Sequence, residues 1–396
     1  MAPLRGRDWE LGVKPRRRML VGSITAVLLA GAAIPLLRTQ LGPVAEEQPP
    51  APAPPIPRGT LPSWLPSGPG TFTYNVRWAD RDHAYAIRGN CATTNGTTDC
   101  GAQLLATEDA AHWEPRTLPA PDGKAESGLL QQLYVLGQEK VVVEAPRERW
   151  YSDDGGRSWR KVPIERGLSV EAIPEGGVLE PQCAVVTTVC RRLGRLLVML
   201  PDSGRSAALA NPPPLQQVSP GTVPAGDGAW WVSGLDPATG RPATAVSRDA
   251  GRSWTVGALP AFDGTPYGGL SITATSGAAY ATAITRTPDG GTWLLAIFRS
   301  TDGGRTWERT WQASGSREPR SINGVVVAAA DGKLIVATQS GTTYVSTDGG
   351  RTFQWNRDLL GHVEWNRGGY FVSNTYPSTV YTWSLDGVYW LRYTVT

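Results

Sequence analysis

The chain has 396 residues and a formal net charge of +3, and it contains 16 Trp and 46 Gly against five Phe and three Met. Six Lys or Arg residues against Asp8 and Glu10 give residues 1–18 a charge of +4, so the remainder carries 3 − 4 = −1. A nearly neutral body lacks the basic stripe of a nucleic-acid-binding protein, so nucleic acid is excluded as an expected partner.

The first predicted element is an apolar helix. Residues 19–37 read MLVGSITAVLLAGAAIPLL and stand between the cluster of arginines 16–18 and Arg38. A helix of this length spans roughly 28 Å, which is enough for the hydrocarbon layer. We expect a transmembrane signal anchor, with the basic tail 1–18 in the cytoplasm and the rest of the chain extracytoplasmic.

Two alternatives to an anchor stay open. Ala30-Gly31-Ala32 offers small residues for a signal peptidase, and RRRML loosely matches a twin-arginine export signal. Cleavage would give a secreted protein instead of a single-pass cell-membrane protein.

A proline-rich linker follows at residues 38–70. Ten prolines fall between Gly42 and Gly70, including the run PPAPAPPIP. Such a segment cannot pack a core and prefers extended polyproline conformation, so we expect a stiff spacer before a body that covers residues 71–396.

The four cysteines fall into two local pairs, Cys91 with Cys100 and Cys183 with Cys190. Neither spacing is CxxC and the chain has three His, so we expect neither a zinc site nor any other metal or cofactor. Paired cysteines are more typical of disulfides in an oxidising compartment. Asn95-Gly96 is a tight-turn signal between the first pair, whereas the second pair needs an unmarked turn near Thr187-Thr188.

The body repeats one short turn. Clear copies are SDDGGRSW from Ser152, SRDAGRSW from Ser247, STDGGRTW from Ser300 and STDGGRTF from Ser346. Degenerate copies start at residues 107, 200 and 384, and in the copy at 200 Asp202, Gly204, Arg205 and Ser206 match the pattern. The seven starts are about 46 residues apart on average, which divides residues 71–396 into seven units.

Each unit also contains four β-rich segments. In the sixth unit they are residues 322–330, 333–338, 342–346 and 352–356, with the repeated turn before the fourth. Four strands per ~46-residue repeat is the period of a β-propeller blade. We therefore predict an all-β fold, a seven-bladed β-propeller of four-stranded antiparallel blades that follows one N-terminal transmembrane helix.

The first blade has four expected strands of its own, near residues 72–78, 83–88, 102–106 and 113–117, and so does the last blade. The ends of the ring are therefore expected to meet by side-chain packing and not through a shared strand.

The repeated turn has an expected mechanical role. Asp302 is placed to accept hydrogen bonds from backbone N–H groups, and Gly304 permits a positive φ. Ser300 or Thr306 can add hydrogen bonds, and Trp307 is expected to pack into its own blade.

These residues resemble the Asp-box, or bacterial-neuraminidase repeat, with its pattern Ser-x-Asp-x-Gly-x-Thr-Trp. The matching residues are Ser152, Asp154, Gly156, Ser158 and Trp159; Ser247, Asp249, Gly251, Ser253 and Trp254; Ser300, Asp302, Gly304, Thr306 and Trp307; and Ser346, Asp348, Gly350, Thr352 and Phe353. The superfamily includes sialidases, xyloglucan-cleaving hydrolases, sortilin-type receptors and photosystem II assembly factors. The resemblance implies that the box aspartates are structural and lie away from the usual ligand site.

Similarity to sialidases would also imply an arginine triad, an acidic general acid and a Tyr/Glu nucleophile pair. The Arg-Ile-Pro motif of that family is absent, and its nearest counterpart is Val76-Arg77-Trp78. Further residues that could line one mouth of the ring are Asp80, Asp82, Glu364, Arg367 and Tyr370. The simpler interpretation is that Arg77 and Arg367 pair with nearby surface carboxylates, and we assign no catalytic residue.

Several aromatic residues offer a different kind of site. Trp230, Trp231, Trp311, Trp355 and Trp365 can stack on sugars or anchor a protein, although packing between blades is the expected role of most of them. The box arginines Arg157, Arg252, Arg305 and Arg351 are expected to be solvated charges on the rim.

Three functions follow as hypotheses. The first is a non-catalytic, membrane-tethered scaffold that binds a protein or glycan outside the cytoplasm. The second is a divergent, exo-acting sialidase-like glycoside hydrolase, which requires two carboxylates facing each other across the channel at ~5–10 Å. The third is an assembly chaperone for membrane proteins. The chain has no GxSxG, HExxH, P-loop or GxGxxG motif to support other common chemistries.

Overall fold

The computed structural model describes residues 59–60, 70–94, 97–119, 132–145, 148–163, 167–183, 193–264, 266, 269–286, 291–356, 361–373 and 380–395. These residues belong to one compact unit, Ala53–Thr396, and their regular structure is β-strand throughout. The predicted tail, the anchor and nearly all of the linker lie outside the described residues. Among the residues that are described, no helix is long and apolar enough to span a membrane.

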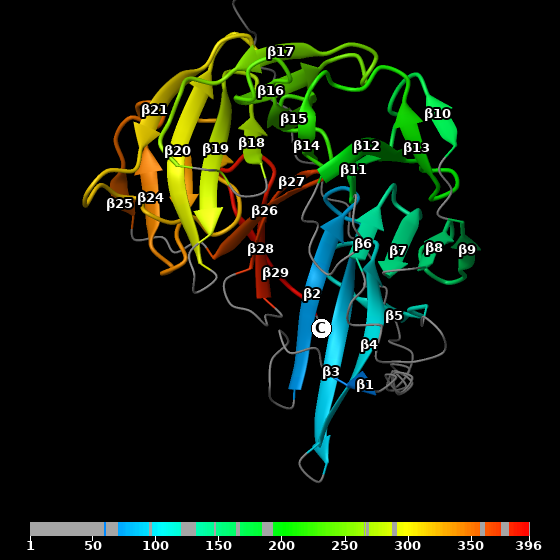
Figure 1. Cartoon of the computed structure of the whole chain (residues 1–396). Helices are drawn as coiled ribbons and strands as arrows, with labels where there is room; N and C mark the ends of the chain where they lie inside the picture. The colour runs from blue at the N-terminus through cyan, green and yellow to red at the C-terminus, as the bar shows by residue number, and fades with distance from the viewer. Residues whose placement is uncertain are drawn as a thin grey trace, which may run out of the picture. The chain divides into compact units, whose positions relative to one another are not determined.

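The described residues form seven β-sheets, as Figure 1 shows, and each sheet is built from strands that follow one another in the sequence. Blade 1 contains β2 (Gly70–Trp78), β3 (Ala84–Thr94), β4 (Thr97–Thr107) and β5 (Glu114–Arg116). Blade 2 contains β6 (Gln132–Val135), β7 (Val141–Ala145), β8 (Glu148–Ser152) and β9 (Arg160–Val162). Blade 3 contains β10 (Leu168–Val170), β11 (Val178–Cys183), β12 (Leu193–Met199) and β13 (Ser206–Leu209).

The remaining blades follow the same scheme. Blade 4 contains β14 (Gln216–Pro220), β15 (Trp230–Leu235), β16 (Pro242–Ser247) and β17 (Thr255–Ala258). Blade 5 contains β18 (Leu270–Ala274), β19 (Ala279–Arg286), β20 (Thr292–Ser300) and β21 (Glu308–Gln312). Blade 6 contains β22 (Val327–Ala328), β23 (Leu334–Ala337), β24 (Thr343–Ser346) and β25 (Gln354–Asn356). Blade 7 contains β26 (His362–Asn366), β27 (Gly369–Ser373), β28 (Val380–Ser384) and β29 (Leu391–Thr394). The predicted seven-bladed β-propeller is confirmed.

Blade 3 departs from the predicted antiparallel order. β10 is the first strand of this blade in the sequence, yet it lies at the outer edge of the sheet, where it pairs in parallel with β13, with Leu168 opposite Ala207. β10 therefore lies at one edge of the sheet and β11 at the other. Five residues, 163–167, separate β9 from β10 in the sequence, and local sequence patterns do not reveal the parallel pairing of β10.

Blade 1 carries a hairpin that is longer than predicted. Strands β3 and β4 have 11 residues each and stay paired out to Thr94 and Thr97, so the hairpin extends well beyond the neighbouring sheets (Figure 1). The short strand β1 (Gly59–Thr60) adds a fifth strand by pairing with Asp99 and Cys100 of β4.

The register of this hairpin sets Cys91 directly opposite Cys100. Their side chains lie outside the described residues, as do Cys190 and the side chain of Cys183. Both disulfides therefore stay predictions, and the first pair has backbone partners that suit a cross-strand bridge.

Side-chain packing joins blade 1 to blade 7. Trp78 of β2 is buried against blade 7, with its ring centroid 5.2 Å from that of Tyr393 and 6.2 Å from that of Phe371. The Tyr381 hydroxyl donates a hydrogen bond of 3.0 Å to the carbonyl of Thr73. No described sheet combines strands from the beginning and the end of the propeller sequence. The ring therefore closes without a shared strand, as the sequence predicted.

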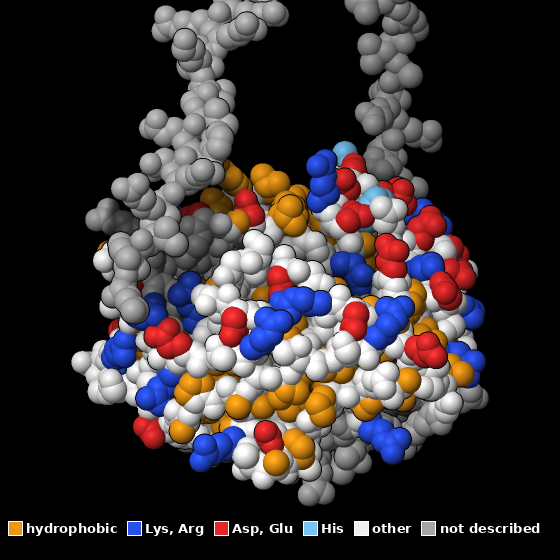
Figure 2. All heavy atoms as spheres, turned by 90° about the horizontal axis from the view of Figure 1, so that it is seen from above, with side chains coloured by type: hydrophobic (Ala, Val, Ile, Leu, Met, Phe, Trp, Pro, Cys, Tyr) orange, Lys and Arg blue, Asp and Glu red, His pale blue; other side chains and the backbone are white. Residues whose placement is uncertain are grey.

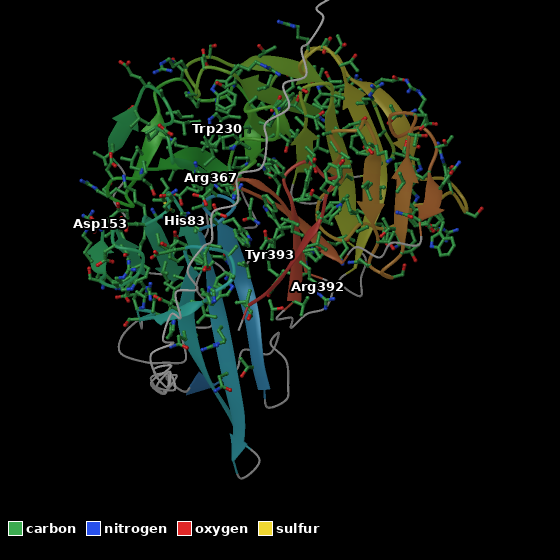
Figure 3. All side chains as sticks on the ribbon, turned by 180° about the vertical axis from the view of Figure 1, so that it is seen from behind. His83, Asp153, Trp230, Arg367, Arg392 and Tyr393 are labelled. Carbon is green, nitrogen blue, oxygen red and sulfur yellow. The ribbon has the colours of Figure 1, made fainter. Side chains whose placement is uncertain are left out.

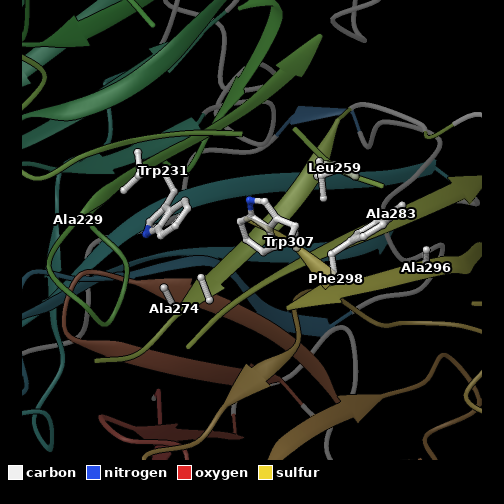
Figure 4. Packing of buried hydrophobic residues seen from close by; sticks show 12 residues of the cluster. Ala229, Trp231, Leu259, Ala274, Ala283, Ala296, Phe298 and Trp307 are labelled. Atoms are coloured by element: carbon white, nitrogen blue, oxygen red, sulfur yellow. The ribbon is translucent and has the colours of Figure 1, made fainter. Parts of the chain in front are cut away.

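Packing between neighbouring blades uses large aromatic side chains. In Figure 4, Trp231 of blade 4 lies beside Trp307 of blade 5, and their centroids are 6.0 Å apart in an edge-to-face arrangement. Such aromatic pairs contribute about 0.5–1.5 kcal/mol beyond the burial of apolar area. Each face of a four-stranded sheet is thus covered by its neighbour.

Each complete Asp-box is a hydrogen-bonded turn between the third and fourth strands of its blade. In blade 5, Asp302 Oδ1 accepts the N–H groups of Arg305 and Thr306, both at 3.0 Å, and its Oδ2 accepts the Thr306 hydroxyl at 2.6 Å. The buried Ser300 hydroxyl accepts the Gly304 N–H at 2.9 Å and donates to Asp302. Asp154, Asp249 and Asp348 accept equivalent bonds in their own boxes.

The box also reaches the preceding blade. Trp159, Trp254 and Trp307 donate their indole N–H to Thr117, Asn211 and Thr244 of the blade before. Trp307 therefore packs between blades 4 and 5, and the expectation that it packs within its own blade was wrong. The turn between the third and fourth strands therefore helps to join two blades, because its tryptophan hydrogen-bonds the preceding blade.

The degenerate copies differ from one another. Asp109 and Asp386 keep the turn, since Asp109 accepts the N–H groups of Ala111 and His112 and Asp386 accepts those of Val388 and Tyr389. Asp202 instead points outward and accepts a hydrogen bond of 2.8 Å from Lys140 of blade 2. The predicted unit near residue 200 exists as the β12–β13 turn, but its aspartate does not bond the turn.

Candidate functional site

The innermost strands of the blades, which are the first strands except in blade 3, where the innermost strand is β11, surround a central channel. This channel holds a cavity of about 480 Å³, which all seven blades line. One lining residue from each blade, in chain order, is Arg77, Gln132, Val178, Thr222, Ser271, Val325 and Glu364. The channel is thus polar at several positions around its wall.

An ion pair bridges the seam of the ring inside the channel. Arg77 Nη1 of blade 1 lies 2.5 Å from Glu364 Oε2 of blade 7, and His362 Nε2 lies 3.4 Å from Glu364 Oε1. Burial by itself would raise the pKa of Glu364, but the charge of Arg77 and the hydrogen bond from His362 lower it to about 2. Glu364 is therefore ionised at neutral pH.

Trp365 of β26 and Arg367 of the β26–β27 turn lie at one end of the channel. Trp365 Nε1 donates a hydrogen bond of 2.8 Å to the carbonyl of Pro224 in blade 4. Arg367 donates to the carbonyls of Gly176 and Gly177 in blade 3, at 3.0 and 2.8 Å. Figure 3 shows Arg367 in the interior of the ring of sheets. Both side chains thus reach across the axis from blade 7.

A larger cavity, which we call the mouth, lies beyond these two side chains. It measures about 760 Å³ and shares Trp365 and Arg367 with the channel, so these side chains partition the two spaces. Its walls are the turns between the first and second strands of blades 4 to 7, together with Leu385 and Asp386 of the last box. The mouth therefore opens on the end of the propeller that also carries the Asp-boxes.

The face of the molecule that Figure 2 presents carries mixed charge. Figure 2 shows Lys and Arg side chains interspersed with Asp and Glu side chains on the face that it presents, with apolar side chains between them. No charge of a single sign dominates that face.

The sequence-predicted site residues separate into two groups. Arg77, Glu364 and Arg367 do line the channel. Asp80 instead accepts the N–H groups of Asp82 and His83 and a hydrogen bond from Gln138, and Asp82 pairs with Arg81. The two aspartates are thus engaged at the β2–β3 turn.

Tyr370 is also engaged. It is buried, and its hydroxyl hydrogen-bonds the N–H and the carbonyl of Ala328, at 3.0 and 3.1 Å. Burial raises the pKa of this phenol well above its usual value. A phenol held in this way is not an activated nucleophile, so the sialidase-like set is not assembled among the described residues.

The interpretation of the two arginines as members of surface ion pairs was half right. Arg77 does pair with a carboxylate, but the pair lies within the channel. Arg367 bonds backbone carbonyls and forms no ion pair with a described residue.

The hydrolase hypothesis required two carboxylates that face each other. Among the described residues that line the channel, Glu364 is the one carboxylate, and among those that line the mouth it is Asp386. Asp386 accepts hydrogen bonds from its own turn. The described side chains also contain no group of three or more His, Cys, Asp or Glu suited to a metal.

The aromatic candidates occupy different environments. Trp230, Trp231 and Trp311 are buried between blades, which confirms their expected packing role. Trp355 is 62% exposed on the outer strand β25, away from both cavities. Trp365 lines both cavities, with its ring 4.7 Å from that of Tyr370 in an edge-to-face contact.

The box arginines lie at the exposed rim, as expected. Arg157 and Arg351 pair with Glu108 and Glu308 of the preceding blades, at 3.0 and 2.6 Å. Arg252 and Arg305 donate to the carbonyls of their own box aspartates.

Two charged residues of the site and one buried arginine outside it were not predicted from the sequence. Arg299 and Lys333 line the mouth. Arg149 is buried between blades 2 and 3, where it binds Glu144 at 2.6 Å and Glu180 at 2.9 Å. Strand alternation offers a signal for Arg299, because it precedes the buried Ser300 and must point to the other face.

Comparison with known protein families supports the repeat. The model of the BNR/Asp-box repeat matches residues 150–161 and 298–309, so the chain carries BNR/Asp-box repeats. No curated protein sequence matches the chain.

Solved structures match the chain at low sequence identity and low TM-score. One is YCF48 bound to D1 peptide, with 15% identity over 86% of this chain and 86% of that chain and a TM-score of 0.30. Another is YCF48 from Cyanidioschyzon merolae, with 14% identity over 78% and 94% and a TM-score of 0.42. The Trypanosoma rangeli sialidase in complex with sialic acid has 11% identity over 82% of this chain but 54% of its own, and a TM-score of 0.34. These structural matches do not identify a ligand for this chain.

Proposed function

We propose that this protein is a non-catalytic, membrane-tethered binding propeller that holds a segment of a partner protein at its mouth, outside the cytoplasm. The observation that carries the proposal is the mouth itself. It is an open cavity of about 760 Å³, within the range of ligand-binding clefts, and it is built from turns of four blades.

The charged side chains around the channel argue against acid–base catalysis. A general acid needs a proton to give at neutral pH, and the pKa of Glu364 of about 2 leaves it ionised. Its partner Arg77 is engaged in the same ion pair, and Asp386 at the mouth is held by its own turn. The described residues of the two cavities therefore supply contacts and not a reacting pair.

The character of the mouth favours a protein segment over a glycan. Sugar recognition commonly uses an open aromatic face, but Trp365 packs its ring edge-to-face with Tyr370 and bonds Pro224 through its N–H. Half of the 22 lining residues are Ala or Gly, which give a smooth wall of methyl and backbone groups. Such a wall fits the apolar side chains of a peptide.

The tether completes the proposal. The apolar run at residues 19–37 and the proline-rich linker 38–70 would hold the propeller at the outer side of the membrane. The two cysteine pairs suit an oxidising compartment. A membrane protein under assembly is one partner that such a location would bring within reach.

Site-specific photo-crosslinking tests the proposal. A photoreactive amino acid at Ser276, an exposed residue of the mouth, is compared in native membranes with one at Ala238, an exposed residue at the opposite end of blade 4. We expect a discrete protein adduct from position 276 and not from 238, with mass spectrometry to identify the partner. Equal adducts at both positions, or none from position 276, would contradict the proposal.

A turnover assay separates the binding function from the hydrolase. The purified chain is incubated with sialosides and other glycosides that carry a fluorescent leaving group. We expect the signal of a protein-free blank. Turnover that disappears in Arg77→Ala would establish the hydrolase instead.

A further inference from the structure

The charges of the mouth are not balanced by its own lining. Arg299, Lys333 and Arg367 face one carboxylate, Asp386, so the lining carries a formal 3 − 1 = +2. Lys333 pairs with the neighbouring Asp331, and Asp386 accepts hydrogen bonds from Ser384 and from backbone N–H groups. With Lys333 balanced by Asp331, the two guanidinium groups and Asp386 leave a formal excess of 2 − 1 = +1.

Arg367 is held by dipoles and not by a counter-charge. It donates to the carbonyls of Gly176 and Gly177, while its Nε is buried without a hydrogen-bond partner among the described residues. Burial lowers the pKa of this guanidinium, although the charge of Glu175 opposes that effect. A desolvated cation with an unused donor gains more from an anion than from a neutral group.

Arg299 of β20, which also lines the mouth, is similar. Its side chain packs against Gly349, and its Nε is buried without a hydrogen-bond partner within the described part of the chain. Arg77 and Arg149, by contrast, each have carboxylate partners within 3 Å. The mouth therefore presents two arginines that have a buried, unpartnered Nε and no carboxylate partner among the described residues.

The wall next to these arginines is apolar and made of small residues. Alanine methyl groups from the turns of blades 4, 5 and 6 line the cavity together with Tyr280 and Leu385. A ligand that fits both features carries an anionic group beside apolar side chains.

We propose that the mouth selects an acidic peptide segment, in which a carboxylate binds Arg367 and Arg299 while flanking apolar side chains lie on the alanine-rich wall. This inference rests on the proposed binding function and names the chemistry of its ligand. The carboxylate replaces the two glycine carbonyls as the partner of Arg367. Binding then releases Arg367, one of the two side chains that partition the mouth from the channel.

A peptide array measures this selectivity. The probes are acetylated and amidated heptapeptides of Ala, Leu and Val that carry either Glu or Gln at the central position. We expect the full chain to retain the Glu peptides at least tenfold more strongly than their Gln partners. A ratio near one, or no retention of any Glu peptide, overturns the inference.

Two variants and one control locate the effect. Arg367→Met is expected to lower the Glu/Gln ratio below twofold. Arg299→Met removes no hydrogen bond to a described residue, so the variant should fold, and it is expected to lower the ratio at least threefold. Arg252→Met removes an exposed rim arginine and should leave the ratio unchanged. A ratio that survives in both mouth variants, with normal thermal melting, refutes the assignment.

The two proposals can fail separately. Crosslinking from position 276 together with a Glu/Gln ratio near one would preserve the binding function and remove the acidic ligand. A tenfold ratio without any adduct in native membranes would preserve the acidic site and remove the proposed partner.

Discussion

Arg77 and Glu364 come from opposite ends of the propeller sequence and form an ion pair across the seam, with Nη1 and Oε2 2.5 Å apart. The pair stands beside the Trp78 cluster, which packs the first blade against the last. It lines the channel as well, so one interaction belongs both to ring closure and to the candidate site.

Removal of this pair should weaken the ring at neutral pH. Arg77→Met is expected to lower the free energy of unfolding by about 1 kcal/mol at pH 7, since the pair is partly exposed and solvent screens it. Urea denaturation followed by tryptophan fluorescence measures the change. Arg320→Met, which removes an exposed arginine near Glu318, serves as the control and should have almost no effect.

The same pair has a defined pH dependence. The pKa of Glu364 is about 2 in the folded state, so its stabilising effect is complete above the ordinary value near 4.5 and is lost as the pH falls toward 2. Wild type should therefore lose more stability than Arg77→Met between pH 5 and pH 2.5. The box aspartates affect wild type and Arg77→Met alike. Equal losses of stability in the two proteins between pH 5 and pH 2.5 would therefore contradict the assignment of the pH dependence to the Arg77–Glu364 pair.

The buried hydroxyl of the Asp-box is expected to matter for stability. Ser300→Ala removes the acceptor of the Gly304 N–H and leaves that buried group unpaired, at a cost of about 1–3 kcal/mol. Thermal or urea unfolding at pH 7 gives the value. A loss below a few tenths of a kcal/mol would mean that water replaces the hydroxyl.

The second glycine of the box has two separable roles. At Gly304 φ is +89°, and a Cβ would lie 2.6 Å from Trp231 of the preceding blade. Gly341 has a φ of +80°, but nothing lies within 4 Å of its Cβ position, so Gly341→Ala carries the backbone strain alone, about 1–2 kcal/mol. Gly304→Ala should cost a further 1–3 kcal/mol, roughly, for overpacking. Equal losses in the two variants would show that the contact with Trp231 relaxes freely.

Arg149, Glu144 and Glu180 form a buried cluster between blades 2 and 3. This cluster should make stability depend on pH in the direction opposite to that of the Arg77–Glu364 pair. Burial raises the pKa of Glu144, and the charge of Arg149 opposes that rise. Arg149→Met leaves Glu144 and Glu180 without their cation and should cost about 3–5 kcal/mol at pH 7. The loss should be smaller at pH 5, because an acid with a raised pKa contributes stability below its ordinary pKa and loses it as the pH rises.

Unfolding midpoints at pH 5 and pH 7 check this expectation. The matched control is the variant Arg149→Met with Glu144→Gln and Glu180→Gln, in which no charge is left and most of the stability should return. An equal loss at both pH values in the single variant would contradict it.

The repeat made most of the fold predictable. The spacing of the boxes gave seven units, and the local pattern around Ser300, Asp302 and Gly304 gave the turn, since its hydrogen bonds join residues within four positions of each other. Ring closure was predictable because blade 1 and blade 7 each hold four strands.

Contacts between distant residues were not predictable in the same way. The parallel pairing of β10 with β13, the packing of Trp231 against Gly304, and the bonds from Arg367 to Gly176 and Gly177 all depend on which blades meet in space. Arg77, Glu364 and Arg367 were found as candidates because terminal blades must be neighbours. Arg299 and the alanine-rich turns of the mouth carry no motif, and only their arrangement around one cavity brings them together.

Hydrogen–deuterium exchange on the full chain, alone and in its native membrane, tests most directly whether the mouth is a binding surface. We predict slower exchange in the native membrane at the mouth turns, residues 224–229, 274–279 and 329–333, and unchanged exchange at the opposite turns, residues 236–241 and 338–342. Unchanged exchange at the mouth turns, or slowing confined to the opposite turns, would contradict the account.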